Sequence, residues 1–196
     1  MNANQKRLLL PIAILALGLV ALIGVVALIL GGSGEQGRVS SIGGPFSLTD
    51  QNGTRVTEAT YRGAPSIVFF GFTHCPDVCP TALFDMSEVL KRLPADKRVS
   101  ALFVTVDPER DTPAILKDYL SSFDPRISGL SGTRPEIDAA LKSYRVYSKK
   151  QPQENGDYSM DHSAIIYLMD KQGRFVTALN LQSPPEAVAK EIQRFM

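Results

Sequence analysis

The chain of 196 residues contains no tryptophan, only two cysteines and only two histidines. Its 21 basic and 20 acidic residues give a formal net charge of +1, so neither sign of charge dominates. Without a basic surplus, nothing in the composition indicates a nucleic acid or an anionic lipid surface as a partner. Two cysteines do not make a disulfide framework, and a domain of about 150 residues has a sizeable core without one. Among these scarce residues, Cys75 and Cys79 are therefore the first candidates for functional residues.

One long uncharged run, Leu8–Leu30, precedes the part that looks globular. Its 23 residues are enough for a helix to cross a bilayer at about 1.5 Å per residue. Lys6 and Arg7 precede the run and no basic residue follows before Arg38, which places the body of the protein on the non-cytoplasmic side. A cleaved signal peptide would share the charged start, but its apolar core would be shorter and no A-x-A motif precedes Gly31.

We therefore expect a single-pass protein of an inner membrane, with its C-terminal domain on the periplasmic-type side. The expected parts are a cytoplasmic N-terminus at 1–7, a transmembrane anchor at 8–30, a flexible Gly- and Ser-rich linker at 31–44 and a folded domain at 45–196.

The folded part alternates strand-like and helix-like stretches. Short apolar runs predict buried strands at Ser66–Phe70 and Val99–Val106, and Asn52-Gly53 predicts the turn of an N-terminal hairpin. Apolar residues spaced by three and four predict a helix at Pro80–Leu93. The further expected elements are helices at 113–123, 133–144 and 184–195, strands at 127–130, 164–169 and 175–179, and a polar loop at 149–161. This order predicts an α/β fold, a mixed sheet with flanking helices, which binds ligands beyond the carboxyl ends of its parallel strands.

The two thiols lie at such a position, between a buried strand and a helix. If Cys79 is in the first helical turn, its Cβ atom lies about 5–6 Å from that of Cys75. A relaxed disulfide needs about 3.5–4.5 Å, whereas two thiolates on one metal ion can be further apart. The helix N-terminus also favours the thiolate form. The spacing favours metal chelation over a structural bridge, and it leaves a reversible disulfide open.

Two thiolates alone leave a metal ion short of ligands, so a third donor is needed. His162 ends the polar loop before the strand at 164–169, where it would face the cysteines across the end of the sheet. His74 adjoins Cys75, but in an extended segment its side chain would point the opposite way. Two thiolates and one imidazole with an open fourth position suit copper, because thiolate favours Cu(I) and imidazole suits both oxidation states.

Three motifs in this order behind a single anchor closely resemble the Sco/SenC family. They are Thr73-His-Cys-Pro-Asp-Val-Cys-Pro80, Val104-Thr-Val-Asp-Pro-Glu-Arg-Asp-Thr112 and Asp161-His-Ser163. The resemblance covers about residues 43–196. It implies a thioredoxin-like fold, copper as the bound metal, and Cys75, Cys79 and His162 as its ligands. It also implies a role in assembling the dinuclear copper centre of cytochrome c oxidase. The expected partners are the copper-site subunit of that oxidase and, as further candidates, other copper chaperones or thiol reductases.

Three other residues are candidates for contacting a partner or supporting the metal ligands. Asp77 lies between the cysteines, although a carboxylate at a helix start is an equally good interpretation. Asp107 follows the second buried strand, and we interpret its segment mainly as a turn with internal hydrogen bonds. Met160 offers a soft thioether, although a methionine there more often only packs.

Two alternative functions use the same sulfurs, Cys75 and Cys79, as a redox pair. The first is a membrane-anchored thiol–disulfide oxidoreductase. Enzymes of the thioredoxin class typically show C-x-x-C after a tryptophan, whereas three residues separate these cysteines and the chain has no tryptophan. A peroxiredoxin would have a threonine three residues before a cysteine, and Phe72 and Pro76 stand there. The second alternative is a sensor of redox poise. We expect a metallochaperone, with thiol–disulfide reductase activity left open.

Overall fold

The computed structural model describes residues 15, 17–26, 42–94, 96–154 and 156–196. Ser40–Met196 form one compact unit. Residues 17–26 are helical, and no helix within the described ranges is long and apolar enough to cross a membrane. The predicted N-terminus at 1–7 lies outside the described residues, and the predicted anchor at 8–30 and linker at 31–44 extend outside them. These three assignments therefore stay predictions.

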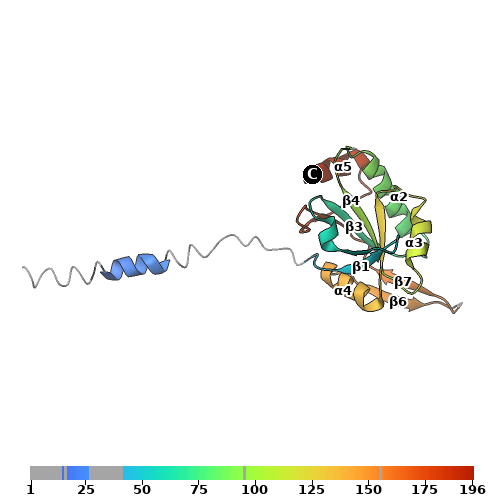
Figure 1. Ribbon diagram of the computed structural model, residues 1–196, viewed down its shortest axis with the longest axis horizontal. Helices are drawn as coiled ribbons and strands as arrows, with labels where there is room; N and C mark the ends of the chain where they lie inside the picture. The colour runs from blue at the N-terminus through green and yellow to red at the C-terminus, as the bar shows by residue number, and fades with distance from the viewer. Residues whose placement is uncertain (1–14, 16, 27–41, 95, 155) are drawn as a thin grey trace, which may run out of the picture. The chain divides into compact units, whose positions relative to one another are not determined.

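A mixed sheet with the strand order β2-β1-β5-β4-β3-β8-β9 forms the centre of the folded unit (Figure 1). β3 is parallel to β4, and β4 is parallel to β5, whereas β8 is antiparallel to β3 and β9 is antiparallel to β8. The strands are β1 (Ser47–Asp50), β2 (Arg55–Thr57), β3 (Ser66–Gly71), β4 (Ser100–Thr105), β5 (Ile127–Ser131), β8 (Ile166–Met169) and β9 (Phe175–Ala178).

The first two predicted buried strands are confirmed as β3 and β4, which are parallel neighbours. The predicted hairpin is confirmed by β1 and β2, and Gly53 stands in its turn at φ 84°, which glycine adopts without strain. A β3-α2-β4 unit followed by the antiparallel pair β8–β9 and a final helix gives the thioredoxin-like arrangement that was expected.

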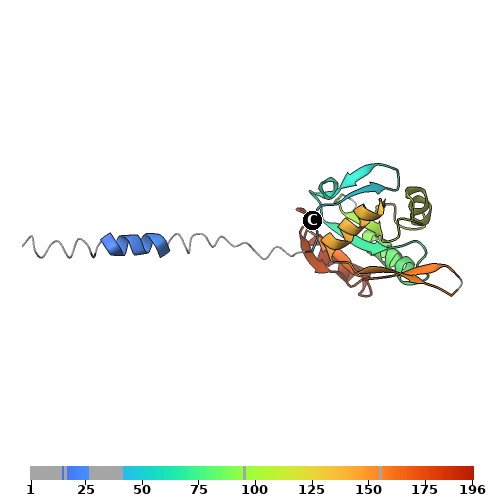
Figure 2. The same ribbon diagram turned by 90° about the horizontal axis from the view of Figure 1, so that it is seen from below.

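Helices cover both faces of the sheet (Figure 1, Figure 2). They are α2 (Val78–Lys91), α3 (Pro113–Leu120), α4 (Arg134–Tyr144) and α5 (Pro185–Gln193), and a short 3-10 helix, η1 (Glu58–Tyr61), follows β2. α3 begins as the sequence indicates, because Thr112 accepts a hydrogen bond from the Ile115 amide at 3.3 Å and Pro113 occupies the first helical position. The start of α3 is therefore set by local capping as well as by apolar spacing.

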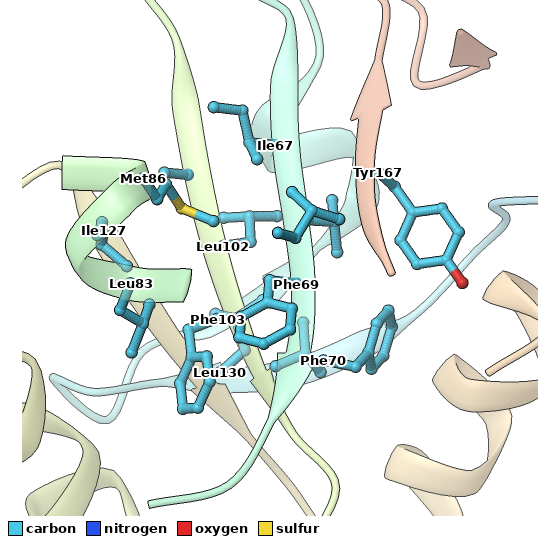
Figure 3. Packing of buried hydrophobic residues seen from close by; sticks show 14 of the residues in the cluster. Ile67, Phe69, Phe70, Leu83, Met86, Leu102, Phe103, Ile127, Leu130 and Tyr167 are labelled. Carbon is cyan, nitrogen blue, oxygen red and sulfur yellow. The ribbon is translucent and has the colours of Figure 1, made fainter. Parts of the chain in front are cut away.

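The core lies on both sides of β3 (Figure 3). On the α2 side, the rings of Phe69 and Phe103 lie 5.8 Å apart, and Leu83 and Met86 pack from the helix. On the opposite side, the ring of Phe70 lies 5.2 Å from that of Tyr144 in α4. Every residue of β3 is buried, which explains why its sequence is an apolar run rather than an alternating pattern.

The prediction of a polar loop at 149–161 is wrong. β6 (Ser148–Pro152) and β7 (Tyr158–His162) form an antiparallel hairpin there, which projects from the body of the unit (Figure 2). Most β6 side chains are exposed, so the strand carries no apolar alternation that would have revealed it. The turn did leave a signal, since Asn155-Gly156 is a typical hairpin dipeptide and Gly156 has φ 82°.

Gly43 marks the place where the chain joins the folded unit. Its amide donates to the Ser143 carbonyl at 2.9 Å, and a Cβ atom added there would lie 2.6 Å from Cε of Met169. Met169 pairs with Ser66, the first residue of β3. The beginning of the folded unit therefore lies at the end of the sheet where β3 starts, and the cysteines follow the other end of that strand.

Candidate metal centre

The two cysteines lie on the segment that connects β3 to α2. Cys75 is half-buried, and Cys79, the second residue of α2, is fully buried. α2 begins two residues before the predicted Pro80, so that Cys79 belongs to its first turn. The Cys79 amide donates to the sulfur of Cys75 at 3.4 Å, which satisfies one of the N–H groups that a helix leaves free at its start. Both residues are free thiols in this structure.

His162, the last residue of β7, brings a nitrogen to the buried sulfur. Its Nε2 lies 3.9 Å from Sγ of Cys79, although 83 positions separate the two residues in the sequence. Nδ1 donates to the Ser163 carbonyl at 3.2 Å, which leaves Nε2 as the free acceptor that faces the sulfur. The ring of Phe72 packs edge-on against the imidazole, with the centroids 5.7 Å apart.

The three predicted ligands thus meet as two pairs that share Cys79. Within the described residues, no three His, Cys, Asp or Glu side chains already converge on one point as a finished metal site. A metal ion typically lies about 2.3 Å from a thiolate sulfur and about 2.0 Å from an imidazole nitrogen, which together span about 4.3 Å. The 3.9 Å between Cys79 and His162 therefore admits one bridging ion. These two donors fit a soft or intermediate metal, and Cys75 is the further sulfur nearby.

Burial favours the neutral forms of Cys79 and His162. Desolvation raises the pKa of the Cys79 thiol well above its usual range, against a smaller opposite effect of the hydrogen bond from the Phe72 backbone. Desolvation also lowers the pKa of His162. The expectation that the helix N-terminus favours the thiolate does not hold for Cys79, because its burial outweighs that effect. A metal ion that binds this sulfur must displace a proton.

Asp111 anchors the segment that carries the cysteines. Nothing in the sequence marked it as a residue of the site. Its fully buried carboxylate accepts hydrogen bonds from the Thr73 amide at 3.0 Å, the Thr73 hydroxyl at 2.6 Å and the Thr105 hydroxyl at 2.6 Å. Burial raises its pKa, since the hydrogen bonds offset the desolvation only in part. Thr73 lies two residues before Cys75, so Asp111 fixes the cysteine segment to the end of β4.

Gly71, the last residue of β3, leaves room for the buried sulfur. A Cβ atom added at this position would lie 2.8 Å from Sγ of Cys79 and 2.6 Å from Cε2 of Phe103. Both distances are too short for carbon, so a larger residue would displace one of the two side chains. Glycine is therefore required for the position of the Cys79 thiol.

A buried charge pair holds the hairpin that carries His162. Asp107 is fully buried, accepts from Nε of Arg110 at 2.5 Å and accepts from the Tyr158 hydroxyl at 2.9 Å. Arg110 also donates to the Tyr158 carbonyl at 3.0 Å, and its guanidinium lies 3.7 Å from the centroid of that ring. The interpretation of the Asp107 segment as a turn with internal hydrogen bonds is confirmed. The turn also fastens β7, and with it His162, to the body of the unit.

The other candidate residues lie apart from the two sulfur contacts. Asp77 is exposed at the N-cap of α2 and makes no side-chain cap hydrogen bond. His74 is exposed, with Nδ1 3.1 Å from the Thr73 hydroxyl. Met160 is buried and belongs to the hydrophobic core, which agrees with the packing interpretation.

Comparison with known proteins gives the chain its family. The model of the SCO1/SenC family matches residues 34–196. ScoI of Bradyrhizobium japonicum, solved with copper bound, is 58% identical, with a TM-score of 0.76 over 79% of this chain and 99% of that one. BsSco, a member of the Sco family of cytochrome c oxidase assembly proteins in which a disulfide switch was identified, is 26% identical, with a TM-score of 0.61 over 76% of this chain and 90% of that one.

Among curated proteins, the mitochondrial protein SCO2 of Saccharomyces cerevisiae is 42% identical over 165 residues, which are 80% of this chain and 54% of that protein. The chain spans about half the length of the first curated relatives that it matches. The match over most of this chain, together with the cysteine pair and the histidine that faces it, shows that the chain belongs to the SCO1/SenC family.

Proposed function

We propose that this protein binds copper through Cys75, Cys79 and His162, and that it delivers the copper to the dinuclear copper site of cytochrome c oxidase or prepares the thiols of that site. The contact of 3.9 Å between the Cys79 sulfur and Nε2 of His162 carries the proposal. Relatives from Bradyrhizobium japonicum, Arabidopsis thaliana and yeast that were solved with copper bound support it.

The donor set suits a copper ion that is held and then released. Two sulfurs favour Cu(I), and the imidazole nitrogen extends the set to Cu(II). Cys79 is buried, whereas Cys75 is only half-buried, so Cys75 is the more accessible of the two residues for an incoming partner. The partner that we propose is the copper-site subunit of the oxidase, and other copper chaperones or thiol reductases would load the copper or reduce the thiols.

A second candidate function, thiol–disulfide exchange, is favoured by the hydrogen bond between the Cys79 amide and the Cys75 sulfur. This bond holds the two thiols one helical turn apart at a helix N-terminus. Oxidation of both thiols to a disulfide would release two protons and two electrons to an oxidant such as another protein disulfide. The relative BsSco has an identified disulfide switch, which supports the same chemistry here. A redox sensor would use the same step.

The proposed place of action is a membrane surface. We propose that 8–30 anchors the chain in an inner membrane and that the folded unit lies on its periplasmic-type side. The support is the uncharged run with basic residues only at its N-terminal flank.

Copper titration of the full chain in two thiol states tests the proposed function. The reduced protein should bind one copper ion per chain, and the protein oxidised to the Cys75–Cys79 disulfide should bind it far more weakly, because metal ligation requires free thiolates. The variant with Cys75→Ser and Cys79→Ser serves as the control without sulfur ligands. Equal copper binding by the oxidised protein would show that the sulfurs are not ligands, and the exchange function would then replace copper delivery.

A further inference from the structure

An open groove of about 470 Å³ lies directly beside the candidate metal centre. One wall is the N-terminal half of α2, which also holds Cys79. The facing wall is the segment 179–182 after β9, together with Ala164, which lies two residues beyond His162. The groove and the metal centre therefore share the elements that form them, and the groove has the volume of an ordinary binding pocket.

Large apolar side chains are exposed on the wall of this groove and on the segments that form it. Val78, which adjoins Cys79 and lines the groove, is 51% exposed, and Ile165, three residues after His162, is 40% exposed. Phe84 of α2 is 59% exposed and lies three residues from Thr81, another residue of the groove wall. Single exposed apolar residues are ordinary on a protein surface, but a group of them around a groove is typical of an interaction site.

The groove also carries negative charge that the folded unit does not neutralise. Asp77, Thr81 and Asp85 recur every four residues, so they lie on one face of α2, and all three line the groove. None of the ion pairs among the described residues includes Asp77 or Asp85, whereas Glu88 on the same helix pairs with Lys91 and Arg92. Eight residues of helix place the two aspartates about 12 Å apart.

We propose that this groove is the docking surface for the copper-site subunit of the oxidase, the acceptor in the proposed function, on which this proposal rests. The geometry selects a segment of the partner that combines apolar side chains with two lysine or arginine residues about 12 Å apart. In an extended chain, residues four positions apart match this spacing, because each residue adds about 3.3 Å. The apolar contacts hold the segment, and the two aspartates steer it toward the half-buried Cys75.

Association of the full chain with the soluble copper-site domain of the oxidase subunit tests the docking surface. Asp85→Lys reverses one charge without touching a sulfur or His162, and Thr81→Trp fills the groove. We expect Asp85→Lys to slow association roughly tenfold at low salt and to lose this effect near physiological salt, where the Debye length falls to about 8 Å. Thr81→Trp should weaken binding at every salt concentration, because the indole ring fills the groove and blocks the partner segment sterically.

The matched control is Asp118→Lys, which reverses an exposed aspartate on α3 that is outside the groove and has no ion pair among the described residues. It should leave the association rate near that of the parent. Equal slowing by Asp85→Lys and Asp118→Lys would overturn the proposal, because net charge would then explain the effect. Unchanged association of both Asp85→Lys and Thr81→Trp would also overturn it.

Copper titration of the same variants separates this proposal from the proposed function. All three variants should keep the copper affinity of the parent. A parent chain that binds no copper refutes the proposed function, whereas the association measurement with copper-free protein still decides whether the groove docks the partner. A parent chain that binds copper but associates through another surface refutes only the docking proposal.

Discussion

His162 joins the hairpin to the cysteine segment. Its Nε2 faces the Cys79 sulfur, while the Ser163 carbonyl holds the proton on Nδ1. A nitrogen in this orientation is not required for thiol exchange, which needs only the sulfurs. Its removal therefore discriminates between copper delivery and the redox alternatives.

We predict that His162→Ala lowers copper affinity by at least about 10- to 100-fold, the range seen when even a supporting residue of a metal site is lost. Cu(II) should be affected more than Cu(I), because two thiolates already hold the monovalent ion. Titration with both ions, together with circular dichroism and a thiol assay, measures the effect and checks that fold and thiols are intact. His74→Ala is the matched control and should bind like the parent, since His74 is exposed and bonds only the adjacent Thr73. Parental affinity of His162→Ala for both ions would remove the histidine from the site.

Gly71 also affects the candidate metal centre, although it has no side chain to bind a metal ion. We predict that Gly71→Ala destabilises the fold by about 1–3 kcal/mol, the usual cost of overpacking, and also weakens copper binding. The added Cβ atom must displace the Cys79 sulfur or the Phe103 ring. Denaturant unfolding and copper titration measure the two effects. Adding Phe103→Leu, which removes the ring atoms nearest to the new Cβ, should recover part of the copper affinity if the sulfur had been displaced through the ring. A Gly71→Ala protein that matches the parent in both measurements would show that the strand end has more room than the structure indicates.

At the scale of elements, the sequence predicted nearly all of the sheet and missed the hairpin that carries a ligand. β3 and β4 were found because both their faces are buried, so their residues are apolar throughout. β6 and β7 project into solvent, so β6 has no buried face to leave a pattern. His162 was nevertheless placed correctly near the cysteines, because its position depends on where β8 begins.

Other parts of the site could not be predicted for a physical reason. Asp111 contacts Thr73 across 38 positions of sequence, and Gly71 is constrained by a sulfur eight residues away. Such contacts arise only when the chain is folded. In the sequence, nothing distinguishes the carboxylate of Asp111 from other carboxylates in polar turns. The sequence does predict where the site lies, because the carboxyl ends of parallel strands meet at the same edge of the sheet.

Helix α4 offers a test of how one cap links two elements. Glu136 accepts from the Thr133 amide at 2.8 Å and from Nη2 of Arg55 in β2 at 2.7 Å. The hydrogen bond from Arg55, followed by that from Thr133, lowers the pKa of Glu136 to about 2. A carboxylate with a lowered pKa adds stability above the pKa of its unfolded form, and this stability is lost as the pH falls toward the folded value.

We predict that Glu136→Ala lowers the free energy of unfolding by about 1 kcal/mol at neutral pH, mainly through the lost cap. The difference from the parent should shrink as the pH falls from 4.5 to about 2, the interval over which the unfolded but not the folded carboxyl group binds a proton. Denaturant unfolding at a series of pH values measures it. Glu154→Ala, which also removes one carboxylate but at an exposed position between β6 and β7, is the matched control. A pH-independent deficit in Glu136→Ala would mean that the charge of Glu136 contributes nothing.

For the whole molecule, three segments that are far apart in sequence meet at one edge of the sheet. They are the connection from β3 to α2, the turn after β4 and the end of β7. The Asp107–Arg110–Tyr158 group joins the second segment to the third, and Asp111 joins the second to the first. The turn after β4 thus holds both halves of the candidate metal centre without supplying a ligand.

The proposed topology is testable on the full chain. We predict that a reporter enzyme active only outside the cytoplasm works when it is fused after Met196, because the basic residues flank only the N-terminal side of the apolar run. Reporter activity in whole cells is the measurement, and a reporter that works only in the cytoplasm is the matched control and should be silent. The reverse result would refute export. A mature chain that begins after Gly31 would preserve export and remove the anchor.

Gly43 lies level with the first residue of β3, and the two sulfurs follow its last residue. A strand of six residues is about 20 Å long, so Gly43 and the candidate copper ligands lie at opposite ends of β3. An acceptor can therefore approach the candidate ligands at the end of β3 without meeting the segment that enters the folded unit at Gly43.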